Sequence, residues 1–80
     1  MNDPVKTLDK ETGDKVGFIT FIIGEFARAY QMDRRQAYLY LKQYGGLAFI
    51  IECWWALHTD TPAQAVFEIQ QICQLNGGML

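Results

Sequence analysis

The chain has few of the residues that build metal or catalytic centres. One histidine, His58, and two cysteines, Cys53 and Cys73, stand among its 80 residues. Structural zinc takes four ligands, usually in closely spaced pairs, and no such pairing is present. Cys53 and His58 are five residues apart, so on a continuous helix their side chains point in different directions. We therefore expect two buried free thiols, and neither a metal site nor a cofactor.

The motifs of common enzyme classes are absent as well. The sequence has no glycine-rich phosphate loop, no GxSxG nucleophile elbow and no paired-carboxylate motif. Cys53 stands among apolar side chains rather than in the electropositive setting that activates a catalytic thiol. The chain is thus predicted not to be an enzyme and to have no catalytic residues. A small enzyme that uses His58 with Glu25 or Cys53 ranks last of three functional hypotheses.

Basic residues are missing from the second half of the chain. Residues 47–80 contain three acids and no lysine or arginine, whereas residues 16–46 carry four basic and two acidic side chains. One side of the molecule is therefore expected to be mildly basic and the other acidic. The formal net charge of −2 and the isoelectric point of about 5.1 argue against generic binding to nucleic acid or to anionic membranes.

Long apolar runs are also lacking. The longest uncharged run, residues 69–80, has twelve residues, and residues 16–24 and 43–51 form runs of nine, whereas a membrane-spanning helix needs about 20 apolar residues. Residues 1–15 are polar and resemble neither a signal peptide nor a transit peptide. Because cysteines without a signal sequence favour a reducing compartment, we expect a cytoplasmic protein that does not enter the membrane.

Half of the residues are nevertheless hydrophobic, and they follow helical spacing. The stretch 46–59 repeats apolar residues at steps of three and four, which places them on one helical face: Leu47, Ile50, Ile51, Trp54 and Leu57. Other apolar residues widen this face beyond a single stripe. A helix of this kind must be covered on more than one side, so it is predicted to be the central packing element.

Local signals predict three further helices. The first runs from about residue 15 to 31, with Val16 on its main apolar face and Phe18 on a second one. A capping-box pattern at residues 33–36 begins the second, and the glycines at 45–46 end it. Thr-Pro-Ala-Gln at 61–64 begins the last helix, with Gln64 expected to complete a capping box, and Asn-Gly-Gly at 76–78 ends it.

The predicted fold is therefore all-α, a compact bundle of about four short helices. A single helical domain over residues 15–80 is expected to follow a polar, loosely ordered segment at 1–14. Within that segment, Asp3-Pro4 can begin a short helix that carries Val5 and Leu8, and Gly13 is expected to interrupt it.

This chain is too small to hide all of its apolar surface, so we expect a homodimer or larger assembly. Trp54 and Trp55 are adjacent and thus about 100° apart around a helix. Both cannot enter the same core, so one is predicted to be buried and the other to lie at the rim. A tryptophan at the rim can anchor a partner protein, because tryptophan is enriched at binding hot spots.

His58 ends the apolar face of the predicted central helix and directly precedes Thr59. Glu25 lies within the apolar stretch of the first helix, and a carboxylate buried there needs a partner. We expect His58 to hydrogen-bond either Glu25 or a carbonyl of the turn, and so to pin the central helix to its neighbour. The candidate interaction or structural polar residues are Glu25, Trp54, Trp55, His58 and Thr59.

Three landmarks carry a resemblance to a known family. They are an apolar helix ending in glutamate at 18–25, a tyrosine and glycine turn within 40–46, and an apolar helix at 49–59 that closes on Leu-His-Thr. Over residues 16–75 the sequence resembles a small bacterial family known only as domain-of-unknown-function family 3791. It departs from the family pattern at Trp54-Trp55, where many members have tyrosines, and in a less acidic last helix.

The resemblance implies a compact helical protein with no established activity. Genes of this family look like neighbours of a toxin of the ADP-ribosyltransferase type, which implies an antitoxin-like or accessory role. Our first hypothesis is a non-enzymatic helical interaction module that self-associates or binds a protein partner, such as that toxin.

The alternative hypothesis is a small DNA-binding transcriptional regulator. Two helices joined by the glycines at 45–46 are compatible with a helix-turn-helix, whose recognition helix would hold residues 47–57. That stretch offers no basic or amide side chain to read base edges or contact phosphate. Nucleic acid is therefore the less favoured partner.

Overall fold

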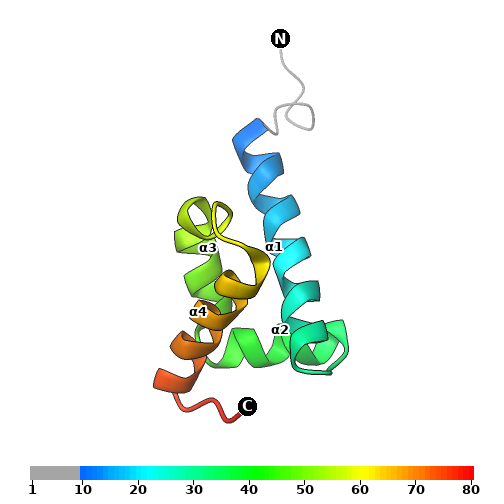
Figure 1. Ribbon diagram of the computed structural model, residues 1–80, viewed down its shortest axis with the longest axis vertical. Helices are drawn as coiled ribbons and strands as arrows, with labels where there is room; N and C mark the ends of the chain where they lie inside the picture. Colours follow the sequence, from blue (N-terminus) through cyan, green and yellow to red (C-terminus); the bar gives the residue numbers. More distant parts are fainter. Residues whose placement is uncertain (1–9) are drawn as a thin grey trace.

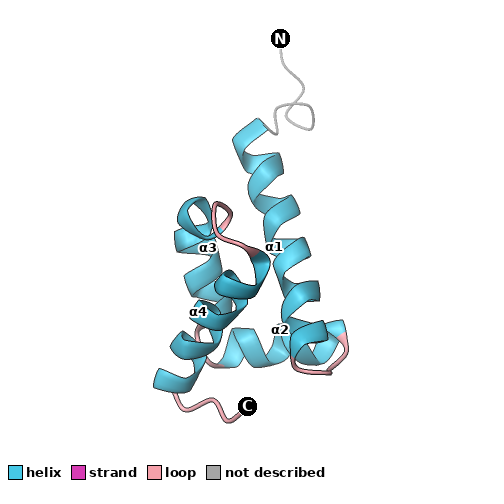
Figure 2. Cartoon of the chain, viewed as in Figure 1, coloured by secondary structure: helices cyan, strands magenta, loops and turns pink. Residues whose placement is uncertain are grey.

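A computed structural model describes residues 10–80, which form four helices joined by short turns (Figure 1). The helices are α1 (Lys10–Ala29), α2 (Arg34–Gln43), α3 (Gly46–Leu57) and α4 (Pro62–Leu75). The described part of the chain contains no strand (Figure 2). The predicted all-α bundle is therefore confirmed.

Helix α1 begins at Lys10, about five residues before its predicted start. Lys10 Nζ lies 3.0 Å from Asp14 Oδ2, one turn along the helix, and pairs at this spacing stabilise helices. The prediction that Gly13 interrupts the chain here is wrong, since a glycine inside a helix costs only about 1 kcal/mol. Residues 10–14 are thus helical. Residues 1–9, with the expected short helix near Val5 and Leu8, lie outside the described residues.

The capping box predicted at the start of α2 is confirmed. The backbone N–H of Gln36 donates to Asp33 Oδ1 at 2.7 Å, and the backbone N–H of Asp33 donates to Gln36 Oε1 at 3.0 Å. Just before it, Gln31 takes a left-handed conformation with φ of +57°, and Met32 N–H donates to the carbonyl of Ala27 at 2.9 Å. These contacts end α1 and let α2 start five residues later.

Gly45 and Gly46 let α3 follow α2 almost directly. Gly45 has a φ of +83°, a left-handed conformation that glycine adopts without a Cβ clash. A Cβ on Gly46 would lie 2.6 Å from Leu41 Cδ2 and 2.7 Å from Cys73 Sγ. The missing side chain therefore allows α2, α3 and α4 to meet around the fully buried Leu41 and Cys73.

The predicted start of α4 is confirmed in its main features. Thr61 Oγ1 accepts a hydrogen bond from the backbone N–H of Gln64 at 3.2 Å, and Pro62 occupies the first helical turn. The Gln64 side chain does not complete the capping box that the sequence predicts. It donates instead to Glu68 at 3.0 Å, one turn along α4.

Helix α3 packs against α1, α2 and α4, but α1 likewise packs against the other three helices, so α3 shares the central position that the sequence predicts for it alone. The largest fully buried side chains come from all four helices: Ile22, Phe26, Leu41, Ile50, Leu57, Ile69 and Cys73. The outer side of α3 is nevertheless open, and Ile51 and Trp55 are exposed there. Val16, predicted on the inner face of the first helix, is also exposed, because the first turns of α1 extend beyond the end of α3 (Figure 1).

Candidate interaction surface at the C-terminal end of helix α3

Trp54 and Trp55 occupy opposite environments near the C-terminal end of α3. Trp54 is 6% exposed and Trp55 is 65% exposed. Their rings meet edge to face, with centroids 5.3 Å apart and an interplanar angle of 84°. The prediction of one buried and one rim tryptophan is confirmed, and the rim residue is Trp55.

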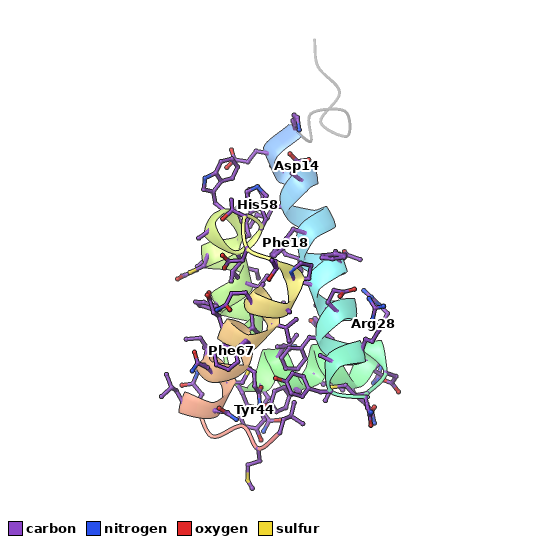
Figure 3. All side chains as sticks on the ribbon, viewed as in Figure 1. Asp14, Phe18, Arg28, Tyr44, His58 and Phe67 are labelled. Carbon is purple, nitrogen blue, oxygen red and sulfur yellow. The ribbon has the colours of Figure 1, made fainter. Side chains whose placement is uncertain are left out.

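The imidazole of His58 lies against both indoles and against α1. Its ring centroid is 5.2 Å from that of Trp54 and 4.8 Å from that of Trp55. Phe18 of α1 approaches the same imidazole edge-on, with centroids 6.4 Å apart (Figure 3). Edge and offset contacts of this kind are favourable between aromatic rings. These four residues, the aromatic cluster, join the end of α3 to α1 and hold Trp55 in place.

Side chains following α3 satisfy carbonyls of its last turn. His58 Nδ1 donates to the carbonyl of Trp55 at 2.6 Å, and Thr59 Oγ1 donates to the carbonyl of Ala56 at 2.7 Å. Because a carbonyl can only accept, Nδ1 of His58 carries the proton in this arrangement. The final carbonyls of a helix have no partner inside the helix. His58 and Thr59 therefore act as a C-terminal cap. The hydrogen bond of His58 stays within α3, so it does not pin the central helix to its neighbour as predicted, and only the ring contact with Phe18 reaches α1.

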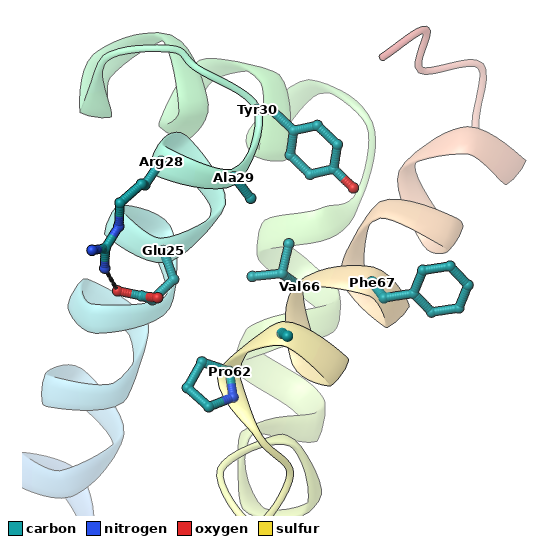
Figure 4. Close-up of a pocket in the computed structure, with 8 residues that line it drawn as sticks. Glu25, Arg28, Ala29, Tyr30, Pro62, Val66 and Phe67 are labelled. Atoms are coloured by element: carbon teal, nitrogen blue, oxygen red, sulfur yellow. Dashed lines mark hydrogen bonds and ion pairs between the residues drawn. The ribbon is translucent and has the colours of Figure 1, made fainter.

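Glu25, the other predicted partner, lies elsewhere. Its carboxylate pairs with Arg28 on the same helix. The pair stands at the rim of a cavity of about 390 Å³ between α1 and α4, whose lining includes Pro62 and Val66 (Figure 4). The predicted alternative contact between Glu25 and His58 is not formed. The carboxylate is only partly covered and finds a cation one turn away, so it needs no buried partner.

A cleft of about 630 Å³ opens beside Trp55. It lies between the end of α3 and the first turns of α1, and it is lined by Lys10, Glu11, Asp14 and Trp55. One exposed indole face thus stands next to Glu11 and to Asp14, and Asp14 is already paired with Lys10. The indole face and the carboxylate of Glu11 together suit a cationic side chain. We refer to the cleft and the aromatic cluster together as the Trp55 surface.

Comparison with known protein families identifies the family of this chain. The family model described as "Protein of unknown function (DUF3791)" matches residues 17–76. The chain belongs to this family. It has no significant match among curated proteins or among solved structures. The match confirms the resemblance inferred from the sequence over residues 16–75.

In this DUF3791 chain, the Leu-His-Thr landmark has a structural explanation. Leu57 is buried in the core, while His58 and Thr59 cap α3. Phe18, which begins the first landmark, contacts the ring of His58. Two of the three landmarks therefore lie where α3 meets α1, whereas the one within residues 40–46 forms the turn from α2 to α3.

Reactive groups are scarce in the described part of the molecule. Cys53 and Cys73 are both free. Cys73 is fully buried, and burial raises the pKa of its thiol, whereas Cys53 is only partly buried. Within residues 10–80, no three His, Cys, Asp or Glu side chains are grouped so that they can hold a metal ion. No helix in that range has the length and apolar character needed to cross a membrane.

Sequence reasoning missed the contribution of α1 to the Trp55 surface. Glu11 and Asp14 fell in the segment expected to be loosely ordered, and Phe18 was assigned only to a second apolar face of the first helix. A signal was present, because Lys10 with Asp14 and Glu11 with Lys15 pair opposite charges at four-residue spacing. That spacing is typical of a helix that already includes residue 10.

Proposed function

We propose that this DUF3791 chain is a non-enzymatic helical interaction module that self-associates or binds a protein partner. The observation that carries the proposal is the environment of Trp55. Its indole is 65% exposed, yet it is held by contacts to Trp54 and His58 beside an acidic cleft. A pre-positioned tryptophan loses little conformational entropy on binding, which is why such residues dominate binding energies.

The chemistry of the same surface favours binding over catalysis. The Nδ1 of His58 is used to cap α3, and the carboxylate of Glu25 pairs with Arg28 away from the imidazole. The thiol of Cys73 is buried. A nucleophile, a base and a group that orients the base are therefore not assembled around His58.

The finer description of this function has two sources. The family resemblance supports a bacterial protein with an antitoxin-like or accessory role, whereas the homodimer and the cytoplasmic location rest on the composition of the sequence. A toxin of the ADP-ribosyltransferase type is then the protein partner. The cleft beside Trp55 predicts that the partner contributes a lysine or arginine, since Glu11 stands beside the exposed indole while Asp14 is paired with Lys10.

The proposal is tested by recovering the tagged chain from cells that naturally produce it. Trp55→Ala is compared with Phe67→Ala, a matched truncation of another exposed aromatic residue on α4. We expect one protein to co-purify with the parent and with Phe67→Ala, and its recovery to fall at least about tenfold with Trp55→Ala. Equal recovery with all three chains would show that Trp55 is not the anchor.

A further inference from the structure

Beyond α1, basic and acidic charges lie on different helices, the basic ones on α2 and the acidic ones on α3 and α4. Beyond residue 15, all four lysine and arginine side chains fall between residues 28 and 42, and residues 47–80 carry acids only. Exposed apolar side chains occur on both parts. One chain thus presents two apolar surfaces of opposite charge, and complementary charge of this kind steers association and fixes its direction.

Helix α2 presents an exposed stripe with an apolar centre and basic ends. Arg35, Tyr38, Leu39 and Lys42 follow each other at steps of three, one and three, so they share one helical face. Tyr38 is 40% exposed and Leu39 is 47% exposed. Among residues 10–80, no acid forms an ion pair with Arg35 or Lys42. We call these four residues the α2 stripe.

A groove between α3 and α4 has the opposite character. Its volume is about 500 Å³, and it is lined by Phe49, Glu68, Gln71, Ile72, Gln74 and Leu75. Leu75 is 82% exposed. Glu52 lies one helical turn from Phe49 along α3, so a second acid stands close to the groove. We call this feature the α3–α4 groove.

We propose that the α2 stripe of one chain docks in the α3–α4 groove of a second copy of this chain. Tyr38 and Leu39 of the stripe cover the apolar floor, and the basic residues at its two ends face the acids of the groove. An amphipathic helix lying in an apolar groove is a recurrent mode of recognition. This inference rests on the proposed function, because it names the surfaces through which the chain self-associates. It leaves the Trp55 surface free for another protein.

Because the stripe and the groove are different surfaces, the association is head to tail. A dimer formed in this way still has one unoccupied stripe and one unoccupied groove. Such interfaces continue into rings or longer assemblies rather than stopping at a two-fold dimer. The average mass of the protein should therefore keep increasing with concentration.

The experiment is sedimentation velocity on the full chain from about 5 μM to about 500 μM, a range suited to micromolar affinity. Leu39→Glu blocks the stripe and Leu75→Lys blocks the groove. Both residues are exposed and both replacements favour helix, and thermal melts check that the variants fold. We expect the parent to at least double its average mass across the range and each variant alone to remain monomeric.

Mixing the two variants in equal amounts is the decisive measurement. The intact stripe of Leu75→Lys fits the intact groove of Leu39→Glu, so the mixture regains association, whereas a two-fold interface made of one surface does not recover in this way. Raising the salt from about 0.05 M to about 0.5 M should weaken the parent's association about tenfold, because it screens the charges.

Three results would overturn the inference: a monomeric parent at every concentration, parent-like association of either single variant, or a mixture that stays monomeric. Trp55→Ala separates this inference from the proposed function. We expect it to associate like the parent. If it alone abolishes self-association, the Trp55 surface is the contact between copies, and the head-to-tail inference is wrong while the proposed function stands.

Discussion

His58 combines two structural roles in one side chain. Its Nδ1 satisfies the carbonyl of Trp55 in the last turn of α3, and its ring fills the space between the indoles and Phe18. The imidazole is nevertheless exposed, so water can replace part of the lost hydrogen bond in a variant. His58 therefore contributes only modestly to the stability of the fold. Its main effect is to hold the neighbouring Trp55 in position.

We expect His58→Ala to lower the free energy of unfolding by about 1 kcal/mol, the usual net value of one hydrogen bond. His58→Phe keeps a ring against Phe18 but lacks the donor, so its loss should be smaller. Urea denaturation of the two variants measures both values. A parent-like midpoint for His58→Ala would show that neither the cap nor the ring stabilises the fold.

Gly46 is a second residue whose role is set by its surroundings. Gly46→Ala should destabilise the protein by about 1–3 kcal/mol, because the added methyl group overpacks a filled core. Its Cβ would meet side-chain atoms of both Leu41 and Cys73. Thermal unfolding monitored by circular dichroism gives the change. A stabilised Gly46→Ala variant would mean that α2, α3 and α4 do not meet as closely as described.

The thiol of Cys73 makes stability depend on pH. Burial raises the pKa of this thiol in the folded chain, so the folded state keeps the proton that the unfolded state releases. Its contribution is fully present below the unfolded thiol pKa and is lost as the pH rises through the folded pKa. We expect the urea midpoint to fall between about pH 8 and pH 10. Cys73→Ala should reduce this fall, whereas Cys53→Ala should leave it unchanged.

At the scale of the helices, the predictable features are those decided by neighbouring residues. The start of α2 and the start of α4 follow from residues 33–36 and 61–64, whose caps form within a few residues. The neighbouring residues do not show in the same way whether Trp54 or Trp55 is the exposed tryptophan. That depends on how α3 rotates against α1 and α4, and both tryptophans lie on apolar parts of α3. The Glu25 contact failed for a different reason, because a local partner, Arg28 three residues along α1, pairs with the carboxylate.

A substitution at Gly13 tests directly whether helix α1 already includes residues 10–14. A Cβ on Gly13 meets nothing within 4 Å, so Gly13→Ala gains helix propensity without a clash. The variant should be more stable by about 0.5–1 kcal/mol. The same substitution in a loosely ordered segment would leave stability unchanged. The urea midpoint of Gly13→Ala distinguishes a helical segment from a loosely ordered one, and Gly46→Ala serves as the destabilising control.

At the scale of the whole molecule, the distribution of charge favours the interaction module over the DNA-binding regulator. The helices α2 and α3 are joined closely enough for a helix-turn-helix, but the exposed outer side of α3 carries Ile51, Glu52 and Trp55. The basic side chains lie on α1 and α2 instead. A DNA duplex approached by α3 would therefore meet an apolar and acidic face, which cannot neutralise phosphates.

We accordingly expect this chain to bind a labelled DNA duplex more weakly than about 10⁻⁴ M at 0.15 M salt, the weak end of non-specific binding. Fluorescence anisotropy at several salt concentrations measures this, with Arg35→Glu as a variant that removes one exposed cation. Micromolar binding that weakens steeply with salt and is lost in Arg35→Glu would favour the DNA-binding regulator. Because Arg35 belongs to the α2 stripe, such a result would also mean that the α2 stripe contacts phosphate. If neither the parent nor Arg35→Glu binds the duplex, the exposed apolar surfaces remain available to other proteins. Exposed apolar side chains suit that class of partner.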